Sequence, residues 1–421
     1  MTRHARLAAL ALLCAPVLAH AQTDSLDVYF LKGTEAYQAQ DFATYERLMI
    51  RVVDLAPAEY TYRYLLARAH ALNANAEAAA FVLHHLLNEG YSLALYATRD
   101  RHFESLRETE AFTPVQALLK TKTKPLNRSA IAFTLPERDL VPEGMAYDPS
   151  EQAFYIGSLE KCKIVRVDRD RDISDFTQPR QDDLVPVLGM KVDLRRRHLW
   201  VATSYGTPKA ALPENLLGTT GLYKYDLESH ALIKRYMLPQ EEHHYLNDVV
   251  IARDGDVYAT DWTGGAVYHI PPSQDRIEKL TDLEGRPNGI ALSPDEAILF
   301  VAGDDILTVD IDTGEAAPLR HPPHIYLSGD GLYFHDNSLI AIQNGACNQV
   351  TRFFLNAAQD SVIRAQTLEA YHPSFDVPTT GALVGDELYY IANSQLGAYD
   401  EKGHLPPPQE MAETHILRVK L

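Results

Sequence analysis

The chain has 421 residues, more than one ordinary hydrophobic core accommodates, so we expect two folded units. Its formal net charge of −18 makes nucleic acid and anionic membrane surfaces poor partners, because like charges repel. No segment after residue 21 reaches about 18 uninterrupted apolar residues, so the sequence predicts no transmembrane helix and no membrane insertion.

Residues 1–21 are predicted to be a secretory signal peptide. Two arginines precede the short apolar run Leu7 to Leu13, and the small-x-small triplet that ends at Ala21 fits a cleavage site. Gln22 is therefore expected to begin the mature chain. The signal peptide carries two arginines and no acidic residue, so its removal takes the formal charge from −18 to −20. We expect an exported protein, periplasmic or secreted.

Residues 22–119 are predicted to form a small all-α helical-repeat domain. Apolar residues recur at spacings of three and four in Val28 to Tyr37 and in Phe42 to Val53. The segments Ala36 to Gln40 and Ala71 to Asn75 align at an offset of 35, close to the tetratricopeptide period. We expect this tetratricopeptide-like domain to pack on the rest of the protein or to bind a protein partner. Nothing in it is typical of a catalytic site.

A polar, proline-containing segment, residues 120–128, is predicted to be a linker, and residues 129–421 have the pattern of an all-β domain. One unit recurs six times: a short polar or glycine-containing start, an apolar strand, an Asp-rich turn and an aromatic-rich strand. The copies begin at Pro142, Leu188, Asn247, Asn288, Asp330 and Thr380. Six such copies predict a six-bladed β-propeller. Ala130 to Phe133 is expected to complete the last blade, because an open ring would leave sheet edges unpaired.

Four of the six strand starts carry a carboxylate or amide side chain at an equivalent position. They are Glu143, Asn247, Asn288 and Asp330. Because the first strand of each blade lines the central channel, we expect these side chains to meet at one mouth of the channel. Two carboxylates and two amide carbonyls suit Ca²⁺ or another hard divalent cation, with water completing the shell. The absence of Cys and His from these positions argues against zinc. The alternative is that the Asn-Gly and Asp-Gly pairs are only turns.

Taken together, these motifs resemble the gluconolactonase/regucalcin (senescence marker protein) family, and the paraoxonase family shares the architecture. The resemblance covers about residues 130–421. The motifs that carry it are Pro142 to Gly144, Asn247 to Trp262, Arg286 to Asp295 and Gly329 to Gly331.

The resemblance implies a calcium-dependent hydrolase of a small-molecule lactone or ester, in which the metal polarises the carbonyl. It implies that Glu143, Asn288 and Asp330 bind the metal and that Asn247 contacts metal or substrate. Asp330 is also implied as the catalytic general base. Sugar-lactonase members carry an arginine where this chain has Tyr245, and a phenol cannot make the bidentate contacts of a guanidinium. The substrate therefore stays open.

Loops between the second and third strands of the blades are expected to shape the pocket. The candidate wall residues are Tyr205, Tyr245, Trp262, Gln343 and Asn393. His243 and His244 precede the third strand start; one of them is a candidate base, but we expect both to be exposed loop residues.

Two further functions fit the same sequence. The first is a non-enzymatic propeller that binds a ligand or a protein partner, with the helical domain as the interaction scaffold. The second is a structural propeller in which calcium only stiffens the ring.

Overall fold

The computed structural model describes residues 23–206, 212–400 and 402–421. The predicted signal peptide, residues 1–21, lies outside the described residues. Within the described ranges, no helix has the length and apolar character needed to cross a membrane.

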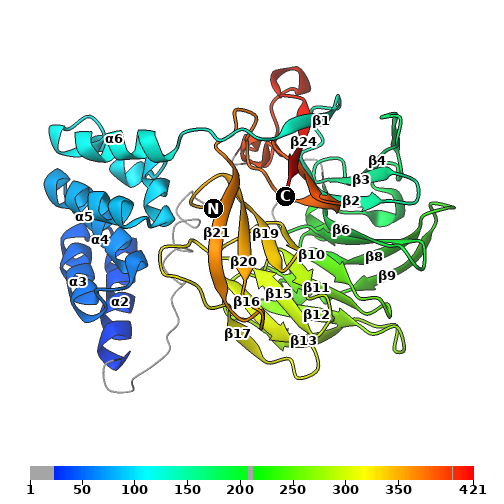
Figure 1. The fold of residues 1–421 in the computed structure, drawn as a ribbon, viewed down its shortest axis with the longest axis horizontal. Helices are drawn as coiled ribbons and strands as arrows, with labels where there is room; N and C mark the ends of the chain where they lie inside the picture. Colours follow the sequence, from blue (N-terminus) through cyan, green and yellow to red (C-terminus); the bar gives the residue numbers. More distant parts are fainter. Residues whose placement is uncertain (1–22, 207–211, 401) are drawn as a thin grey trace. The chain divides into compact units, whose positions relative to one another are not determined.

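The chain divides into two compact units, one helical and one built of strands (Figure 1). The helical unit ends at Lys124 and also takes in Pro322–Tyr326. The strand unit comprises Pro125–His321 and Leu327–Leu421. A short loop from the middle of the second unit thus belongs with the first, which the sequence pattern did not predict.

The predicted helices are present. They are α2 (Thr23–Gln38), α3 (Phe42–Leu55), α4 (Tyr60–Leu72), α5 (Ala76–Glu89) and α6 (Thr113–Lys122), with the short 3₁₀ helices η2 (Ser92–Thr98), η3 (Arg101–Leu106) and η4 (Glu110–Phe112) before α6. Asp41 caps α3 by accepting from the backbone N–H of Thr44 at 3.1 Å, and Asn75 caps α5 by accepting from Ala78 at 3.3 Å. Each cap begins the second helix of a pair, α3 after α2 and α5 after α4. The tetratricopeptide assignment stays a prediction.

The predicted linker, residues 120–128, begins in a helix, because α6 runs to Lys122. The end of the linker is fixed to the propeller by Glu369, whose side chain is fully buried. Its carboxylate accepts the backbone N–H of Arg128 at 3.0 Å and of Ser129 at 2.8 Å. A buried carboxylate needs such donors, so this end of the linker is held in place.

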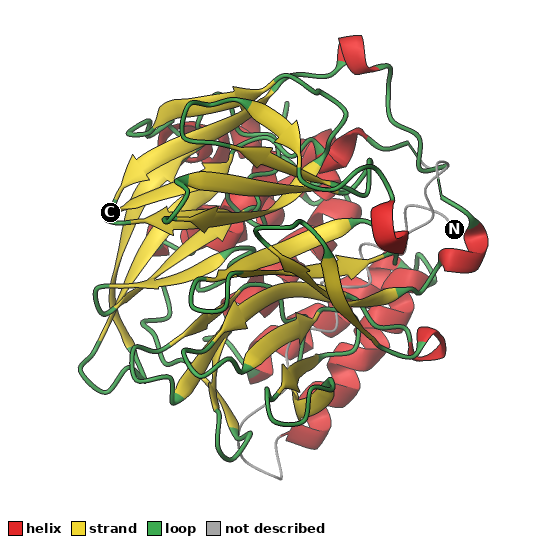
Figure 2. Ribbon diagram, turned by 90° about the vertical axis from the view of Figure 1, so that its right-hand side faces the viewer, coloured by secondary structure: helices red, strands yellow, loops and turns green. Residues whose placement is uncertain are grey.

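The predicted six-bladed propeller is present as six four-stranded sheets, whose strands are yellow in Figure 2. The first three blades are β2 (Pro142–Asp148), β3 (Ala153–Ser158), β4 (Ile164–Val167) and β5 (Ile173–Asp175); β6 (Val187–Asp193), β7 (His198–Ser204), β8 (Thr220–Asp226) and β9 (Leu232–Met237); and β10 (Leu246–Ile251), β11 (Val257–Asp261), β12 (Ala266–Ile270) and β13 (Glu278–Asp282). The next two are β14 (Ile290–Leu292), β15 (Ile298–Ala302), β16 (Ile306–Asp310) and β17 (Ala316–Pro318); and β18 (Leu332–His335), β19 (Ser338–Gln343), β20 (Gln349–Leu355) and β21 (Val362–Ala370).

The sixth blade closes the ring with strands from both ends of the propeller. It contains β22 (Gly381–Val384), β23 (Glu387–Ile391), β24 (Thr414–Lys420) and β1 (Ala130–Leu135). β1 pairs antiparallel with β24, with Leu135 opposite Thr414 and Phe133 opposite Ile416. The predicted closure by Ala130 to Phe133 is therefore confirmed.

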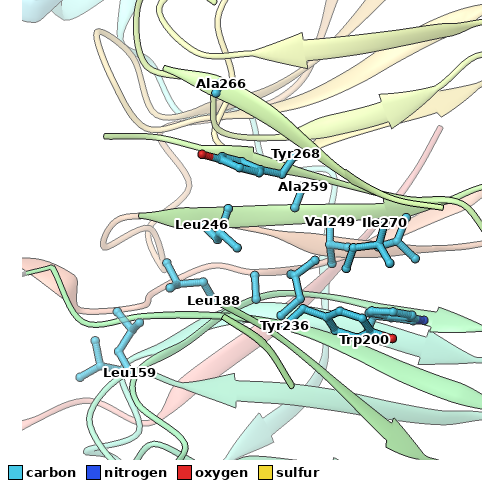
Figure 3. Packing of buried hydrophobic residues seen from close by; sticks show 14 of the residues in the cluster. Leu159, Leu188, Trp200, Tyr236, Leu246, Val249, Ala259, Ala266, Tyr268 and Ile270 are labelled. Atoms are coloured by element: carbon cyan, nitrogen blue, oxygen red, sulfur yellow. The ribbon is translucent and has the colours of Figure 1, made fainter. Parts of the chain in front are cut away.

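The hydrophobic core lies in layers between neighbouring blades. Figure 3 shows the layer between blades 2 and 3, where Trp200 and Tyr236 of one blade pack near Leu246, Val249 and Tyr268 of the next. All five are buried. The second strand of each blade has apolar neighbours on both faces, which is why β11 is buried along its whole length. These layers hold the inner strands, and with them the channel mouth, in place.

Candidate functional site

Each blade begins with a β-bulge in or just before its innermost strand. In β2, Glu143 and Gly144 together oppose a single residue of β3, and β6 and β10 shift register at the equivalent place. In blade 4, Asn288 N donates to Ala302 O at 2.6 Å, and Ala302 N donates to Gly289 O at 2.8 Å, which is the same two-for-one pairing. Bulges re-aim side chains out of the regular alternation of a strand.

The first residue of each bulge occupies an equivalent position around the ring. These residues are Glu143, Leu188, Asn247, Asn288, Asp330 and Thr379. Four of the six are the predicted ligands, so the alignment of the sequence copies placed these four residues at equivalent positions correctly. The Asn-Gly and Asp-Gly pairs are parts of these bulges, and their role as metal ligands stays a prediction.

The second residue of each bulge contacts the next bulge along the ring. A Cβ on Gly144 would stand 1.7 Å from the carbonyl oxygen of Leu188, and one on Gly289 would stand 2.3 Å from that of Asp330. Gly189 and Gly331 approach the following bulges in the same way. Only glycine allows this approach, so the glycines bring the ligand candidates of neighbouring blades together.

Polar side chains make the contact in the two bulges that lack glycine. The hydroxyl of Thr380 donates to the carbonyl oxygen of Glu143, which joins blade 6 to blade 1. Asp248 Oδ2 accepts the backbone N–H of Ile290 at 3.3 Å, which joins blade 3 to blade 4. The six bulges therefore form a closed ring at one end of the channel.

The four candidate ligands are shielded from bulk water. Glu143, Asn247 and Asp330 are 6%, 6% and 7% exposed, and Asn288 is half-buried. Within the described part of the chain, Oδ1 of Asn288 and Oδ1 of Asp330 are buried and accept no hydrogen bond. Buried polar atoms are normally satisfied, so two such oxygens in adjacent bulges call for a partner.

Asp330 stands in a group of buried charges. Burial raises the pKa of Asp330 to about 6, the amides of Asn344 and Asn288 oppose the rise, and the charge of Asp248 adds to it. Burial also raises the pKa of Asp248 to about 6, against the backbone N–H of the next residue and the ammonium of Lys191. Burial lowers the pKa of Lys191 in turn. An opposite charge beside a buried carboxylate favours its charged form, so a bound cation would lower the pKa of both carboxyl groups.

The residues present fit a hard divalent cation. No three His, Cys, Asp or Glu side chains gather as a metal site in the ranges that the structure describes. The set at the ring has two carboxylates, so a cation there also depends on the amide oxygens of Asn247 and Asn288. Carboxylate and amide oxygens are the donors that Ca²⁺ prefers, and the open oxygens of Asn288 and Asp330 match that need.

Two aromatic side chains, those of Tyr245 and Trp262, contact each other in blade 3. The ring of Tyr245 lies against Gly206, where an added Cβ would come within 2.5 Å of it. Its centroid is 6.0 Å from that of Trp262, edge to face, and the guanidinium of Arg286 lies 4.6 Å from the Trp262 ring. Tyr245 and Trp262 were predicted as pocket walls, and this arrangement is compatible with that role.

Tyr245 also shows which ligand candidates lie near one another. Burial raises the pKa of its phenol, and the charges of Glu143 and then Asp330 raise it further. Both carboxylates therefore act electrostatically on the same hydroxyl. Asn288 neighbours Asp330, and Asn247 follows Tyr245 by two residues.

The other three predicted wall residues are engaged within their own blades. Tyr205 is 2% exposed in a small buried apolar cluster. Gln343 Oε1 accepts hydrogen bonds from two side chains of β20 at 2.7 and 2.8 Å. The amide of Asn393 bonds two backbone groups at the start of β24, at 2.9 and 2.7 Å. The amides of Gln343 and Asn393 therefore hold the ends of strands in place.

His243 is exposed as expected, but the expectation was wrong for His244, which is 8% exposed. Its Nδ1 lies 2.5 Å from Oδ2 of Asp261. Oδ1 of Asp261 accepts the backbone N–H of Tyr245 at 2.8 Å and of Gly264 at 2.9 Å. Asp261 is fully buried, and a buried carboxylate requires such donors. The pair holds the backbone that carries Tyr245.

Sequence reasoning also missed Asn344, which follows β19 directly. Its Nδ2 donates to Oδ2 of Asp330 at 2.5 Å and to the carbonyl oxygen of Pro378 at 2.9 Å. The loop was predicted to return to the mouth, but its neighbour Gln343 was chosen as the wall residue. Nothing in the one-dimensional pattern distinguishes two consecutive amides at the end of a strand.

Comparisons with known proteins agree with the strand motifs. Residues 141–333 match the model of the SMP-30/gluconolactonase/LRE-like region, and this segment contains all four ligand candidates. Comparison with curated protein sequences gives no match.

Similar solved structures include a gluconolactonase from Xanthomonas campestris, with 16% identity, coverage of 70% of this chain and 95% of that chain, and a TM-score of 0.47. They also include a calcium-binding protein, regucalcin, from Agrobacterium tumefaciens strain C58, with 16% identity, coverage of 69% and 95%, and a TM-score of 0.47. A virginiamycin B lyase from Staphylococcus aureus has 16% identity, coverage of 61% and 80%, and a TM-score of 0.44. Over residues 141–333, the propeller of this chain is thus similar to the family that its motifs resemble.

Proposed function

We propose that this protein is a calcium-dependent hydrolase of a small-molecule lactone or ester, acting at the mouth of the propeller channel. The observation that carries the proposal is the ring of bulges. It aligns two carboxylates and two amides, and it leaves the Oδ1 atoms of Asn288 and Asp330 buried without a hydrogen bond. The family match over residues 141–333 supports a lactonase-type hydrolase.

Glu143, Asn247, Asn288 and Asp330 would hold the cation. When bound there, a hard divalent cation polarises a carbonyl and favours attack by water. In the proposed mechanism, the amide of Asn247 orients the substrate and Asp330 accepts a proton from the attacking water. The closed ring of bulges keeps these groups fixed, so little reorganisation accompanies the reaction.

The walls of the proposed pocket favour a substrate with a flat or apolar part. Tyr245 and Trp262 offer aromatic surfaces, and Arg286 offers a guanidinium beside them. A phenol at the position of Tyr245 gives one hydroxyl and a ring where a guanidinium would give several donors. We therefore favour aryl esters and lactones with an apolar substituent over highly hydroxylated sugar lactones.

The test uses the full mature chain, freed of metal with a chelator. Ca²⁺ binding is measured by calorimetry, and hydrolysis of a panel of aryl esters, alkyl lactones and sugar lactones is followed with and without Ca²⁺. We expect binding, and turnover that needs the ion. Asp330→Asn should lose both, while Asp312→Asn, at an exposed position, should keep both.

Two outcomes would contradict the proposal in different ways. A chain that binds no Ca²⁺ has no metal site at the ring. A chain that binds Ca²⁺ but hydrolyses no member of the panel is a binding or structural propeller.

A second candidate function is the binding of a protein partner by the helical unit. The observation in its favour is a cavity of about 700 Å³ in that unit, lined among others by Tyr37, Phe42, Leu72 and Arg101. A pull-down that needs residues 23–124, from a chain that shows no turnover, would favour this function over hydrolysis.

We also propose an exported location, periplasmic or secreted, from the pattern of residues 1–21. The intact mass of the protein recovered from its native source should correspond to a chain that begins at Gln22. A mass that includes residues 1–21 would contradict export by cleavage.

A further inference from the structure

Two proposed roles fall on one carboxylate, that of Asp330. A carboxylate has two oxygens with about four lone-pair sites between them, so binding a cation and accepting a proton at once requires the oxygens to be used differently. In the structure the two oxygens of Asp330 differ in their hydrogen bonds. Oδ2 accepts a hydrogen bond from Asn344, and Oδ1 is buried without one in the described part of the chain.

The orientation of Asn344 is set by the fold. One N–H of its amide donates to Asp330 Oδ2 at 2.5 Å, and the amide also donates to the carbonyl oxygen of Pro378 at 2.9 Å. Pro378 immediately precedes the bulge of blade 6, so Asn344 spans from its own blade to the next. An amide held at two points can fix the plane of the carboxylate that it contacts.

The strand that ends just before Asn344, β19, is itself held firmly. Gln343, the last residue of β19, is fully buried, and its Oε1 accepts from Gln349 at 2.7 Å and from Thr351 at 2.8 Å. Asp330 N donates to Ile342 O at 2.7 Å, which ties the bulge to the same strand. Donor and acceptor therefore belong to one rigid corner of blade 5.

We propose that Asn344 is a positioning residue: by holding Oδ2, it fixes the Asp330 carboxylate so that Oδ1 is the oxygen presented to the cation beside Asn288. This inference rests on the proposed function, because it assigns roles within the same site. Oδ2 keeps a second lone pair, which is the one left for the proton of the attacking water. Loss of a group that orients a metal ligand in this way typically weakens metal binding about 10- to 100-fold.

The experiment removes the donor while keeping the volume of the side chain. Asn344→Leu is compared with the unmodified chain by Ca²⁺ calorimetry after chelation. Terbium luminescence, excited through the protein, gives a second measurement of cation binding. The expected result is a loss of affinity of roughly 10- to 100-fold.

The matched control is Asn356→Leu. Asn356 makes the same type of bond, from Nδ2 to Oδ1 of Asp360 at 2.7 Å, but on the surface. We expect its Ca²⁺ affinity to stay within about twofold of the unmodified chain, because an exposed amide–carboxylate pair outside the ring of bulges does not orient the ligands.

Thermal melting in chelator shows whether each variant folds, and Asn344→Ala replaces the leucine variant if that one does not. A folded Asn344 variant with unchanged Ca²⁺ affinity would overturn the positioning role while leaving the metal site intact. An unmodified chain without Ca²⁺ binding would overturn the proposed function, and this inference with it. If turnover is found, a positioning role also predicts a change in the Ca²⁺ concentration needed for half-maximal activity, which a purely structural role would not move.

Discussion

Gly289 and Asp261 show how single residues set the geometry of the channel mouth. Position 289 requires glycine because the carbonyl of the neighbouring bulge occupies the space where a Cβ would stand. Asp261 holds backbone N–H groups and His244 with both oxygens of a fully buried carboxylate. Both residues act through position, and neither has to touch a substrate.

Gly289→Ala should weaken the propeller. The new methyl group would stand 2.3 Å from the carbonyl oxygen of Asp330 and 2.7 Å from the backbone N of Leu332, so the two bulges must move apart. Overpacking of this kind costs about 1–3 kcal/mol. Chemical denaturation followed by tryptophan fluorescence measures the change. Gly397→Ala, where nothing lies within 4 Å of the new methyl group, should change the free energy of unfolding by less than about 0.5 kcal/mol.

Asp261→Asn should loosen the segment that carries Tyr245. An amide cannot accept with both terminal atoms, so at least one of the donors that now face the carboxylate loses its acceptor. Leaving a buried donor without a partner costs about 1–3 kcal/mol. The emission of Trp262, measured in a Trp200→Phe background, should shift because Trp262 contacts Tyr245.

The control for Asp261→Asn is Asp400→Asn, because Asp400 makes the same kinds of hydrogen bond at an exposed position. Asp400 accepts the backbone N–H groups of Lys402 and His404 at 2.8 and 2.9 Å and lies 3.3 Å from the His404 ring, but the pair is more than half exposed. Asp400→Asn should therefore have little effect on stability. Equal losses from both substitutions would show that burial of Asp261 is not what matters.

At the scale of elements, the propeller depends on repetition and closure. The bulges recur in all six blades, and each touches the next, so the mouth is built by the blades together and by none of them alone. β1 completes the last blade by pairing with β24, which leaves no gap between the first and last sheets.

Leu135→Ala should weaken the closure of the ring. Leu135 is fully buried in the layer between blade 6 and blade 1, and its truncation leaves a cavity there. The expected loss is about 2–5 kcal/mol in the free energy of unfolding. Ile131→Ala on the same strand is the control, because Ile131 is 53% exposed and should lose less than about 0.5 kcal/mol. Similar losses from both would contradict a role for the buried face of β1.

At the scale of the whole molecule, each of the two units has its own core and its own buried charges. In the helical unit, Asp100 pairs with Arg68 at 3.3 Å and with His102 at 2.5 Å, and accepts from the hydroxyl of Tyr64 at 2.9 Å. Burial alone would raise the pKa of Asp100, but the hydrogen bond from His102 and the charge of Arg68 outweigh it and lower the pKa to about 2.

This pair predicts how the helical unit responds to acid. The folded-state pKa of Asp100 is below the unfolded value of 3.8, so its contribution is fully present above about pH 4 and is lost as the pH falls toward 2. The loss should be about 2 kcal/mol. Thermal unfolding followed by circular dichroism at the helical band measures it, since the other unit is built of strands.

Asp100→Asn separates the two effects. It should remove this acid dependence, and it should also destabilise the helical unit at pH 7 by about 3–5 kcal/mol, because it leaves Arg68 buried without its counter-charge. An Asn variant with the same acid profile as the unmodified chain would assign the dependence to other carboxylates.

The sequence by itself determined the two units, the six-fold repeat, the closing strand and the phase that places Glu143, Asn247, Asn288 and Asp330 at equivalent positions. These follow from local periodicity, which a chain carries without its tertiary contacts. Only the tertiary structure decided that the Asn-Gly and Asp-Gly pairs are bulges, that His244 is buried against Asp261, and that Asn344 holds Asp330. Each of these depends on which blade stands beside which and on what fills the space between them, and that information is not contained in any single stretch of the chain.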